Sequence, residues 1–314
     1  MAKKKAYFMG LLANTDSTIL AVDLDHGFKI EDISQGNAIS LISTIEGIPY
    51  EVARENLFFN PPYLDSSGSK LYYIGNSFDI SFEVNDEGIW LNFPHDLENF
   101  RHNLDLGYVQ PVILLMRLFK EGNICIPIKY YYFVDNNTPK SLGRESTVFW
   151  MPPEPKFTLV HSELPGLQRL IQDTKLPFKE EFLQLAFDNF NLSYQTYNIN
   201  LSFLSLMISL EALFNPGGQE LRYRVSRNIA VLLGKGKDDS KLIFSEIKDL
   251  YDKRSNIVHA GKSNIISKDD LLKLRFYVRE AIKEVINMGK NKTELLDMLN
   301  SCGFGEKQWS RQTI

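Results

Sequence analysis

A chain of 314 residues is too long for one ordinary hydrophobic core, and its hydrophobic content of 44% is enough to fill two. The net charge of −4 disfavours a general nucleic-acid-binding protein. The two cysteines, Cys125 and Cys302, match no metal-ligand or redox spacing, which disfavours a metal site and favours a reducing, cytoplasmic setting.

No segment has the pattern of a signal peptide or a membrane span. The basic start MAKKKAYFMG leads into an apolar run that polar residues interrupt at 14–16. The longest apolar run elsewhere, 112–119, contains Arg117 and is far shorter than the roughly 20 residues needed to cross a bilayer. We therefore expect a soluble protein without a membrane partner.

Residues 1–150 are expected to form a strand-rich mixed domain. Runs rich in Tyr, Phe, Ile and Val, bounded by Asn, Asp and Gly, predict strands at 17–24, 70–84 and 124–134. Apolar spacing predicts helices at 38–47 and 108–122. No Gly-rich phosphate loop occurs in the sequence, and no cofactor is expected.

The proline-containing segment 151–177 is expected to be a linker, with a strand at 156–160 and a short helix near 166–174. Beyond it the apolar spacing becomes helical, which makes the predicted fold class α+β. Helices are expected at 178–197, 201–215, 219–234, 241–261 and 267–290, with a loop at 235–240 and a C-terminal helix or tail at 291–314. The helix at 201–215 is apolar almost all round and should be central.

Basic residues are concentrated in the C-terminal part of the chain. Residues 220–290 hold 16 Lys and Arg against 10 Asp and Glu, an excess of six, whereas the rest of the chain is acidic. This asymmetry suits an anionic partner, although solvated helix surfaces produce it too.

One carboxylate, Glu211, lies inside the most apolar of these helices. Such a group needs a partner, and the next helix offers Arg222, Arg224 and Arg227. A structural ion pair between two helices and a role in chemistry both fit.

The segment 254-RSNIVH-259 carries the candidate catalytic pair, Arg254 and His259. Five residues turn an ideal helix through about 500°, so the two side chains converge only if the helix ends or distorts between them. Gly261 is a plausible helix stop, which places His259 in the last turn. A histidine that exchanges protons and a guanidinium that holds a phosphate are a minimal set for RNA cleavage without metal. Because one pair supplies one histidine, the chemistry suggests a homodimer.

The spans 206–234 and 247–261 together resemble the HEPN domain of the ApeA-like group, through their "LEALF", "YRVSRNIAVLL" and "LYDKRSNIVHAG" segments. The resemblance covers about residues 178–290. It implies an antiparallel helical bundle that dimerises with its Arg/His motifs facing each other. It also implies a metal-independent endoribonuclease, often a toxin or an antiphage-defence effector.

Within that resemblance the motif arginine falls on Arg254 and the motif histidine on His259. Ser255, Asn256 and Glu211 are the auxiliary candidates, and Arg222, Arg224 and Lys253 are the candidates for RNA binding. The chain departs from the pattern at two positions, Ser255 and Ala260.

Two other interpretations remain open. A HEPN-fold dimer could bind RNA or nucleotide without cleaving it and regulate another protein. In the plainest interpretation, Arg254 and Asn256 only brace the helix end. The N-terminal domain would sense a phage or cellular ligand, regulate the nuclease or bind a partner, and no motif in it selects among these roles.

Overall fold

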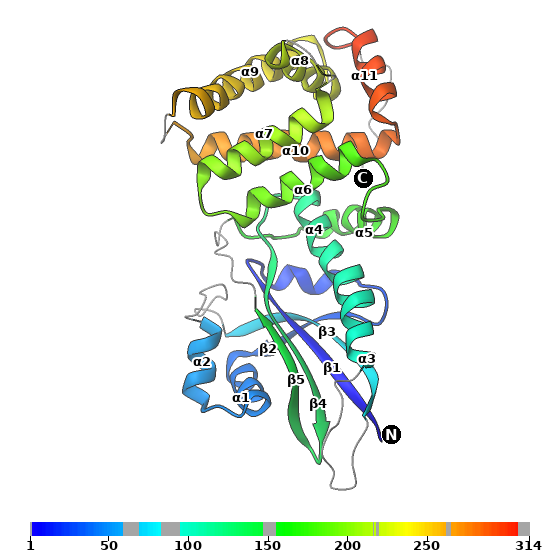
Figure 1. Ribbon diagram of the computed structural model, residues 1–314, viewed down its shortest axis with the longest axis vertical. Helices are drawn as coiled ribbons and strands as arrows, with labels where there is room; N and C mark the ends of the chain where they lie inside the picture. The colour runs from blue at the N-terminus through cyan, green and yellow to red at the C-terminus, as the bar shows by residue number, and fades with distance from the viewer. Residues whose placement is uncertain are drawn as a thin grey trace. The chain divides into compact units, whose positions relative to one another are not determined.

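The computed structural model describes residues 2–58, 69–82, 95–146, 155–215, 217, 220–261 and 265–306. The chain divides into two compact units, Met1–Asp173 and Thr174–Ile314. The first unit combines an antiparallel sheet with helices and the second is helical where it is described, so the chain is of the expected α+β class (Figure 1). No helix within these ranges is long and apolar enough to cross a lipid bilayer.

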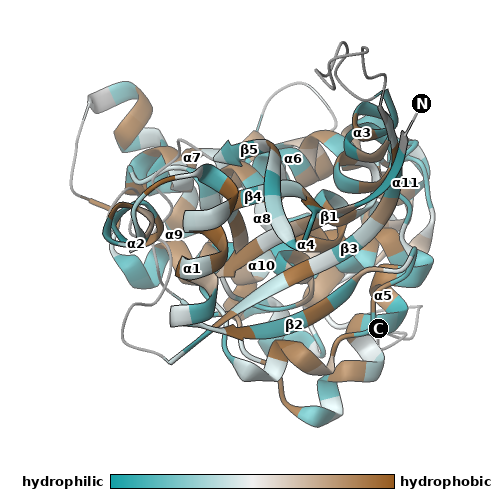
Figure 2. Cartoon of the chain, turned by 90° about the horizontal axis from the view of Figure 1, so that it is seen from below, coloured by the Kyte–Doolittle hydropathy of each residue, from teal (hydrophilic) through white to brown (hydrophobic). Residues whose placement is uncertain are grey.

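Five strands of the first unit form one antiparallel sheet in the order β2-β3-β1-β4-β5. They are β1 (Ala2–Ala13), β2 (Lys29–Ser34), β3 (Lys70–Phe82), β4 (Cys125–Asp135) and β5 (Thr138–Ser146). Ala6 of the central strand β1 lies opposite Phe78 of β3 and Phe133 of β4. Hydrophobic and hydrophilic residues are mixed along β2 and β3 (Figure 2), because successive side chains of a strand point to opposite faces.

Helices cover both faces of β1. On one face Met9 and Leu11 belong to a buried cluster with residues of α1 (Gln35–Glu46) and α2 (Tyr50–Phe58). On the other face the ring of Phe8 lies 5.8 Å from that of Phe100. Phe100 ends α3 (His95–Phe100), which continues as a π-helix (Arg101–Val109) and then as α4 (Gln110–Phe119).

Two expected strands of the first unit are wrong. Residues 17–24 do not form a strand, because the Asp16 side chain accepts a hydrogen bond from the Thr18 backbone and starts a 3₁₀ helix, Ser17–Ala21. Segment 156–160 makes only a single bridge, between Phe157 and Thr15.

The expected linker 151–177 contains structure of its own. A short 3₁₀ helix, His161–Glu163, leads into α5 (Leu164–Asp173), and both belong to the first unit. Parts of some expected elements, 83–84, 147–154, 219 and 307–314, lie outside the described residues.

The helices of the second unit follow the predicted order closely. They are α6 (Glu181–Gln195), α7 (Ile199–Phe214), α8 (Leu221–Leu233), α9 (Lys237–Ala260), α10 (Lys268–Met288) and α11 (Lys292–Ser301). The apolar helix α7 is central, as expected, and packs against α6, α8, α9 and α10.

The loop expected at 235–240 is shorter than predicted. α9 already begins at Lys237, after Gly236. Asp238 and Asp239, which resemble loop residues in the sequence, occupy the first turn of the helix, where its dipole favours carboxylates.

Candidate functional site

The end of α9 places the candidate histidine where the sequence predicts it. Gly261 has a left-handed backbone, with φ of 61°, and its N–H binds the carbonyl of Asn256, so His259 lies in the last turn. The helix neither ends nor distorts between Arg254 and His259. The two side chains therefore leave α9 about 140° apart within one chain.

Arg254 is held by two side chains. Its guanidinium nitrogen Nη2 lies 3.5 Å from Oε1 of Glu211 on α7. The hydroxyl of Tyr251, on α9, donates a hydrogen bond of 2.8 Å to the same oxygen. The guanidinium carbon also lies 5.7 Å from the centroid of the Tyr251 ring, within the range of a cation–π contact. These three residues are called the Glu211 cluster below.

The Glu211 cluster orients Arg254 without burying it. The side chain of Arg254 is 25% exposed and that of Glu211 is 19% exposed. Burial, together with the hydrogen bond to Glu211, raises the pKa of Tyr251 to about 12. The phenol therefore remains a donor near neutral pH, and the guanidinium is fixed but accessible. Tyr251 is not among the site residues predicted from the sequence, although its position three residues before Arg254 puts both on one helix face.

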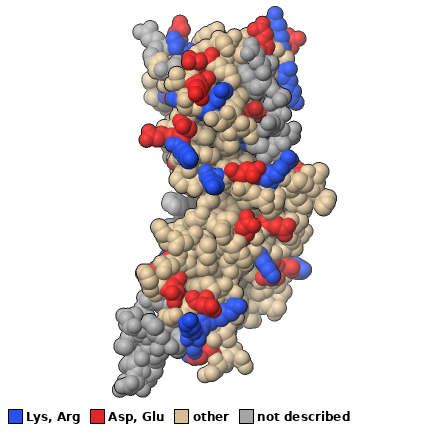
Figure 3. Space-filling view, turned by 90° about the vertical axis from the view of Figure 1, so that its right-hand side faces the viewer, with Lys and Arg blue, Asp and Glu red and all other residues tan. Residues whose placement is uncertain are grey.

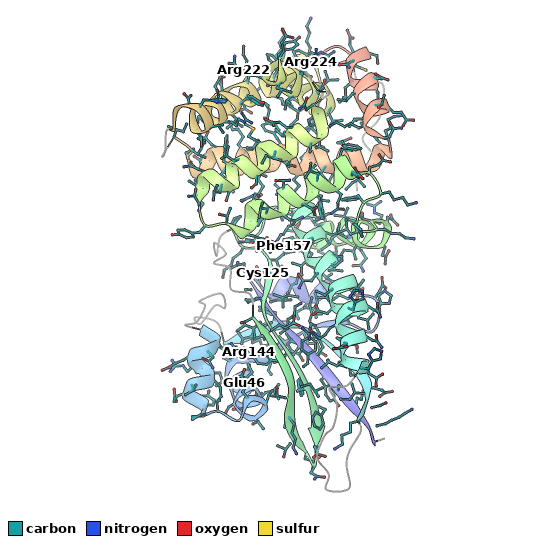
Figure 4. The ribbon with its side chains drawn as sticks, viewed as in Figure 1. Glu46, Cys125, Arg144, Phe157, Arg222 and Arg224 are labelled. Carbon is teal, nitrogen blue, oxygen red and sulfur yellow. The ribbon has the colours of Figure 1, made fainter. Side chains whose placement is uncertain are left out.

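The expected partners of Glu211 on α8 bind elsewhere. Arg222 pairs with Asp252 of α9. Arg227 donates to the carbonyls of Leu299, at 3.0 Å, and Cys302, at 2.6 Å. Arg224 is exposed, and within the described ranges its guanidinium has no ion pair. Figure 4 labels Arg222 and Arg224 on α8. Glu211 meets α9 instead because α7 is central and packs against both helices.

The remaining auxiliary candidates lie on an exposed face of α9. Ser255 and His259 are four residues apart, share this face and are both exposed. Asn256 is exposed as well, and its side-chain amide donates to the carbonyl of Asp252 at 3.0 Å. In one chain, then, Arg254 lies with Glu211 and Tyr251, whereas Ser255 and His259 lie apart from them. The side chain of Ala260 lies outside the described part of the structure.

Lys253, a candidate for RNA binding, connects α9 to the start of α10. Its ammonium lies 2.6 Å from Oδ2 of Asp270. Asp270 and Ser267 also form a reciprocal cap, with the Ser267 hydroxyl accepting from the Asp270 backbone. Burial opposes ionisation of Asp270, but hydrogen bonds from Lys253 and Ser267 outweigh it and lower the pKa of the carboxyl.

Several of the basic side chains near the motif form ion pairs with carboxylates. Arg222, Lys253 and Arg254 each have one, so a phosphate would have to compete for them. On the face drawn in Figure 3 basic and acidic side chains are intermixed rather than gathered into one basic patch. Among the described residues, no group of three or more His, Cys, Asp or Glu could hold a metal ion.

Comparisons with protein-family models, with curated proteins and with solved structures find no match to this chain.

Proposed function

We propose that the chain is a metal-independent endoribonuclease of the HEPN type, an antiphage-defence effector or toxin that cleaves RNA at a cleft between two copies. The observation that carries the proposal is that a fixed guanidinium and an exposed histidine both lie near the end of one helix. Glu211 and Tyr251 hold Arg254, and the last turn of α9 exposes His259.

The chemistry needs a base, an acid, a cation and the RNA itself. A base takes the proton of a ribose 2′-hydroxyl, and the oxygen attacks the adjacent phosphorus. The bond from phosphorus to the 5′-oxygen breaks as an acid protonates that oxygen, which leaves a 2′,3′-cyclic phosphate and a 5′-hydroxyl. His259 exchanges protons, and Arg254 stabilises the negative charge that develops on the phosphate.

A second copy supplies what one chain lacks. Within one chain the two side chains diverge by about 140°, and there is one motif histidine for two proton transfers. A two-fold axis beside the end of α9 brings a second Arg254 and a second His259 to the same cleft.

An exposed apolar stripe on α7 supports such an assembly. Leu201, Leu204, Ile208 and Glu211 follow at helical spacing along one face of the helix. Leu201 is 54% exposed and Ile208 is 45% exposed. The stripe thus leads to the Glu211 cluster, and a partner chain that covered it would bury apolar surface next to Arg254.

Cleavage of single-stranded RNA in EDTA tests the activity. Wild-type protein should produce fragments ending in 2′,3′-cyclic phosphate, and Arg254→Ala and His259→Ala should each remove the activity. Lys241→Ala, at the other end of α9, is the matched control and should cleave normally. Undiminished cleavage by both motif variants would refute the assignment.

Mixing experiments test the two-copy cleft. If both histidines are needed, equal amounts of wild-type and His259→Ala protein, once subunits have exchanged, retain about a quarter of the wild-type activity. An independent site in each chain would leave about half. Sedimentation of Ile208→Glu, expected to be monomeric and inactive, gives a second readout.

Two observations favour the alternative, a HEPN-fold module that binds RNA or nucleotide without cleaving it. Arg254 already has a carboxylate partner, and His259 lies apart from it in the chain. In that case Arg254→Ala weakens RNA binding, His259→Ala is nearly silent, and the wild-type protein produces no fragments.

A further inference from the structure

A surface groove lies between α8 and α9, beside the Arg222–Asp252 pair. Its volume is about 420 Å³, and it is lined by Glu220, Arg222, Tyr223 and Lys248. It therefore combines two cations, one carboxylate and one aromatic ring. Neither Tyr223 nor Lys248 belongs to the Arg/His motif.

Tyr223 presents an aromatic surface to solvent in this groove. Tyr223 is 53% exposed, although a ring of this size is more often covered. The ring is supported at one side by Phe244 of α9, with centroids 5.7 Å apart and planes at 74°. Phe244 in turn contacts Phe304, at 5.6 Å. A ring buttressed in this way loses little further freedom when a flat ligand stacks on it.

Lys248 supplies a charge that a phosphate could neutralise. Its ammonium lies 5.9 Å from the centroid of the Phe244 ring, and no carboxylate pairs with it within the described part of the chain. This distinguishes it from Arg222 and Lys253, whose carboxylate partners a phosphate would have to displace.

The groove and the motif histidine share one face of α9. Phe244, Lys248, Asp252, Ser255 and His259 follow at intervals of four, four, three and four residues, which keeps them within one narrow stripe of an unbroken helix. The stripe extends for about 22 Å, enough for several nucleotides of an extended strand. Arg222 meets it at Asp252 and Tyr223 meets it at Phe244.

We infer that this groove is a binding site for single-stranded RNA, in which Tyr223 stacks on an unpaired base and Lys248 binds a phosphate of the strand that continues toward His259. Rings that stack on bases between cations are how proteins bind single strands, whereas a duplex keeps its bases stacked inside. Glu220 repels phosphate and suits the base end of the groove, where a carboxylate accepts from an exocyclic amine. RNA as the substrate class rests on the proposed function. The single-stranded form of that RNA and the roles of Tyr223 and Lys248 go beyond it.

Binding is measured without cleavage, so the two proposals can fail separately. The probe is a fluorescent single-stranded RNA of about ten nucleotides. It is 2′-O-methylated, so it lacks the hydroxyl nucleophile, and its anisotropy is followed with wild-type protein in EDTA. Tyr223→Leu keeps an apolar contact with Phe244 but removes the stacking ring, and should weaken binding at least about 5-fold. Tyr223→Phe should bind as wild type does.

Matched controls lie on other surfaces of the same unit. Phe276→Ala removes another exposed ring, and Lys179→Ala removes an exposed ammonium that lies outside α9, just before α6. Neither should change the affinity. Lys248→Ala should lower the slope of log affinity against log salt concentration by about 0.7, the value for one phosphate contact in a single strand. A methylated duplex should bind more weakly and should not distinguish Tyr223→Leu from wild type.

Equal affinities of Tyr223→Leu and Phe276→Ala for the single strand would overturn the inference. So would undetectable binding of the probe, or a duplex preferred over the single strand. If the wild type cleaves RNA while Tyr223→Leu binds normally, the groove proposal fails and the nuclease stands. If no cleavage occurs but binding depends on Tyr223, the nuclease proposal fails and the groove stands.

Discussion

The carboxylate of Glu211 joins the guanidinium of Arg254, at 3.5 Å, across the contact between α7 and α9. The same carboxylate oxygen accepts the hydroxyl of Tyr251 at 2.8 Å. Because Tyr251 and Arg254 are three residues apart on α9, one acidic side chain fixes two neighbouring groups of that helix. The carboxylate also offsets the charge that Arg254 would present to a phosphate.

Two substitutions at Glu211 separate these roles. Glu211→Gln keeps an oxygen for Tyr251 and removes the charge, so unfolding in urea should show a loss of at most about 1 kcal/mol. Glu211→Ala also leaves the phenol without its acceptor and should cost about 1–3 kcal/mol. In cleavage assays Glu211→Gln should lower KM, because phosphate no longer competes with a carboxylate, and lower kcat, because Arg254 is held less firmly. A raised KM would contradict this role.

The Lys253–Asp270 pair predicts an acid-sensitive link between α9 and α10. The pKa of Asp270 is lowered in the folded protein, so its stabilising contribution is complete above the ordinary aspartate pKa near 4 and is lost as the pH falls below it. Asp270→Asn should flatten the unfolding free energy against pH below about 4. Asp269→Asn changes an exposed neighbour and should retain the wild-type slope. If the unfolding free energy of both variants had the same slope against pH, the Lys253–Asp270 pair would not be the source of the acid sensitivity.

Two glycines allow the helix stop at the motif to be tested against a matched stop elsewhere. Gly261 ends α9 with φ of 61° and Gly289 ends α10 with φ of 59°, and an added Cβ meets nothing within 4 Å at either one. Alanine at each should therefore lower the free energy of unfolding by about 1–2 kcal/mol, the cost of a left-handed backbone. Only Gly261→Ala should reduce RNA cleavage, because it disturbs the turn that carries His259. Equal losses of cleavage activity in Gly261→Ala and Gly289→Ala would show that the end of α9 has no special role in the candidate site.

Arg227 and Arg224 offer a comparison between a guanidinium that binds carbonyls and an exposed guanidinium, both on α8. Arg227 donates to carbonyls at the end of α11, and Arg227→Ala should destabilise the protein by about 1.5–3 kcal/mol because charged hydrogen bonds are lost. Arg224→Ala removes an exposed side chain and should change stability by at most about 0.5 kcal/mol. Thermal or urea unfolding distinguishes them, and equal losses would be inconsistent with the anchoring of α11.

In the first unit, sequence patterns identified two strands and two helices that contain long, regular runs, but not the central strand β1. The predicted strands 70–84 and 124–134 correspond to β3 and β4 where they are described, and the predicted helices at 38–47 and 108–122 correspond to α1 and α4. Strands with a polar face were missed. β2 reads KIEDIS, and the edge strand β5 reads TPKSLGRES, with a proline that an edge tolerates. β2 pairs with β3, which lies far from it in sequence, whereas β5 pairs with β4, which directly precedes it in a hairpin.

By itself the sequence determined the order of the helices in the second unit, the central place of the apolar helix α7, and the end of α9 at Gly261. These features depend on residues within a few positions of each other, through helical spacing and backbone conformation. Only the tertiary structure decided that Glu211 joins Arg254 and Tyr251, that Arg222 joins Asp252, and that Tyr223 lies beside Phe244. The physical reason is that α7, α8 and α9 meet through packing, and packing selects partners by proximity in space.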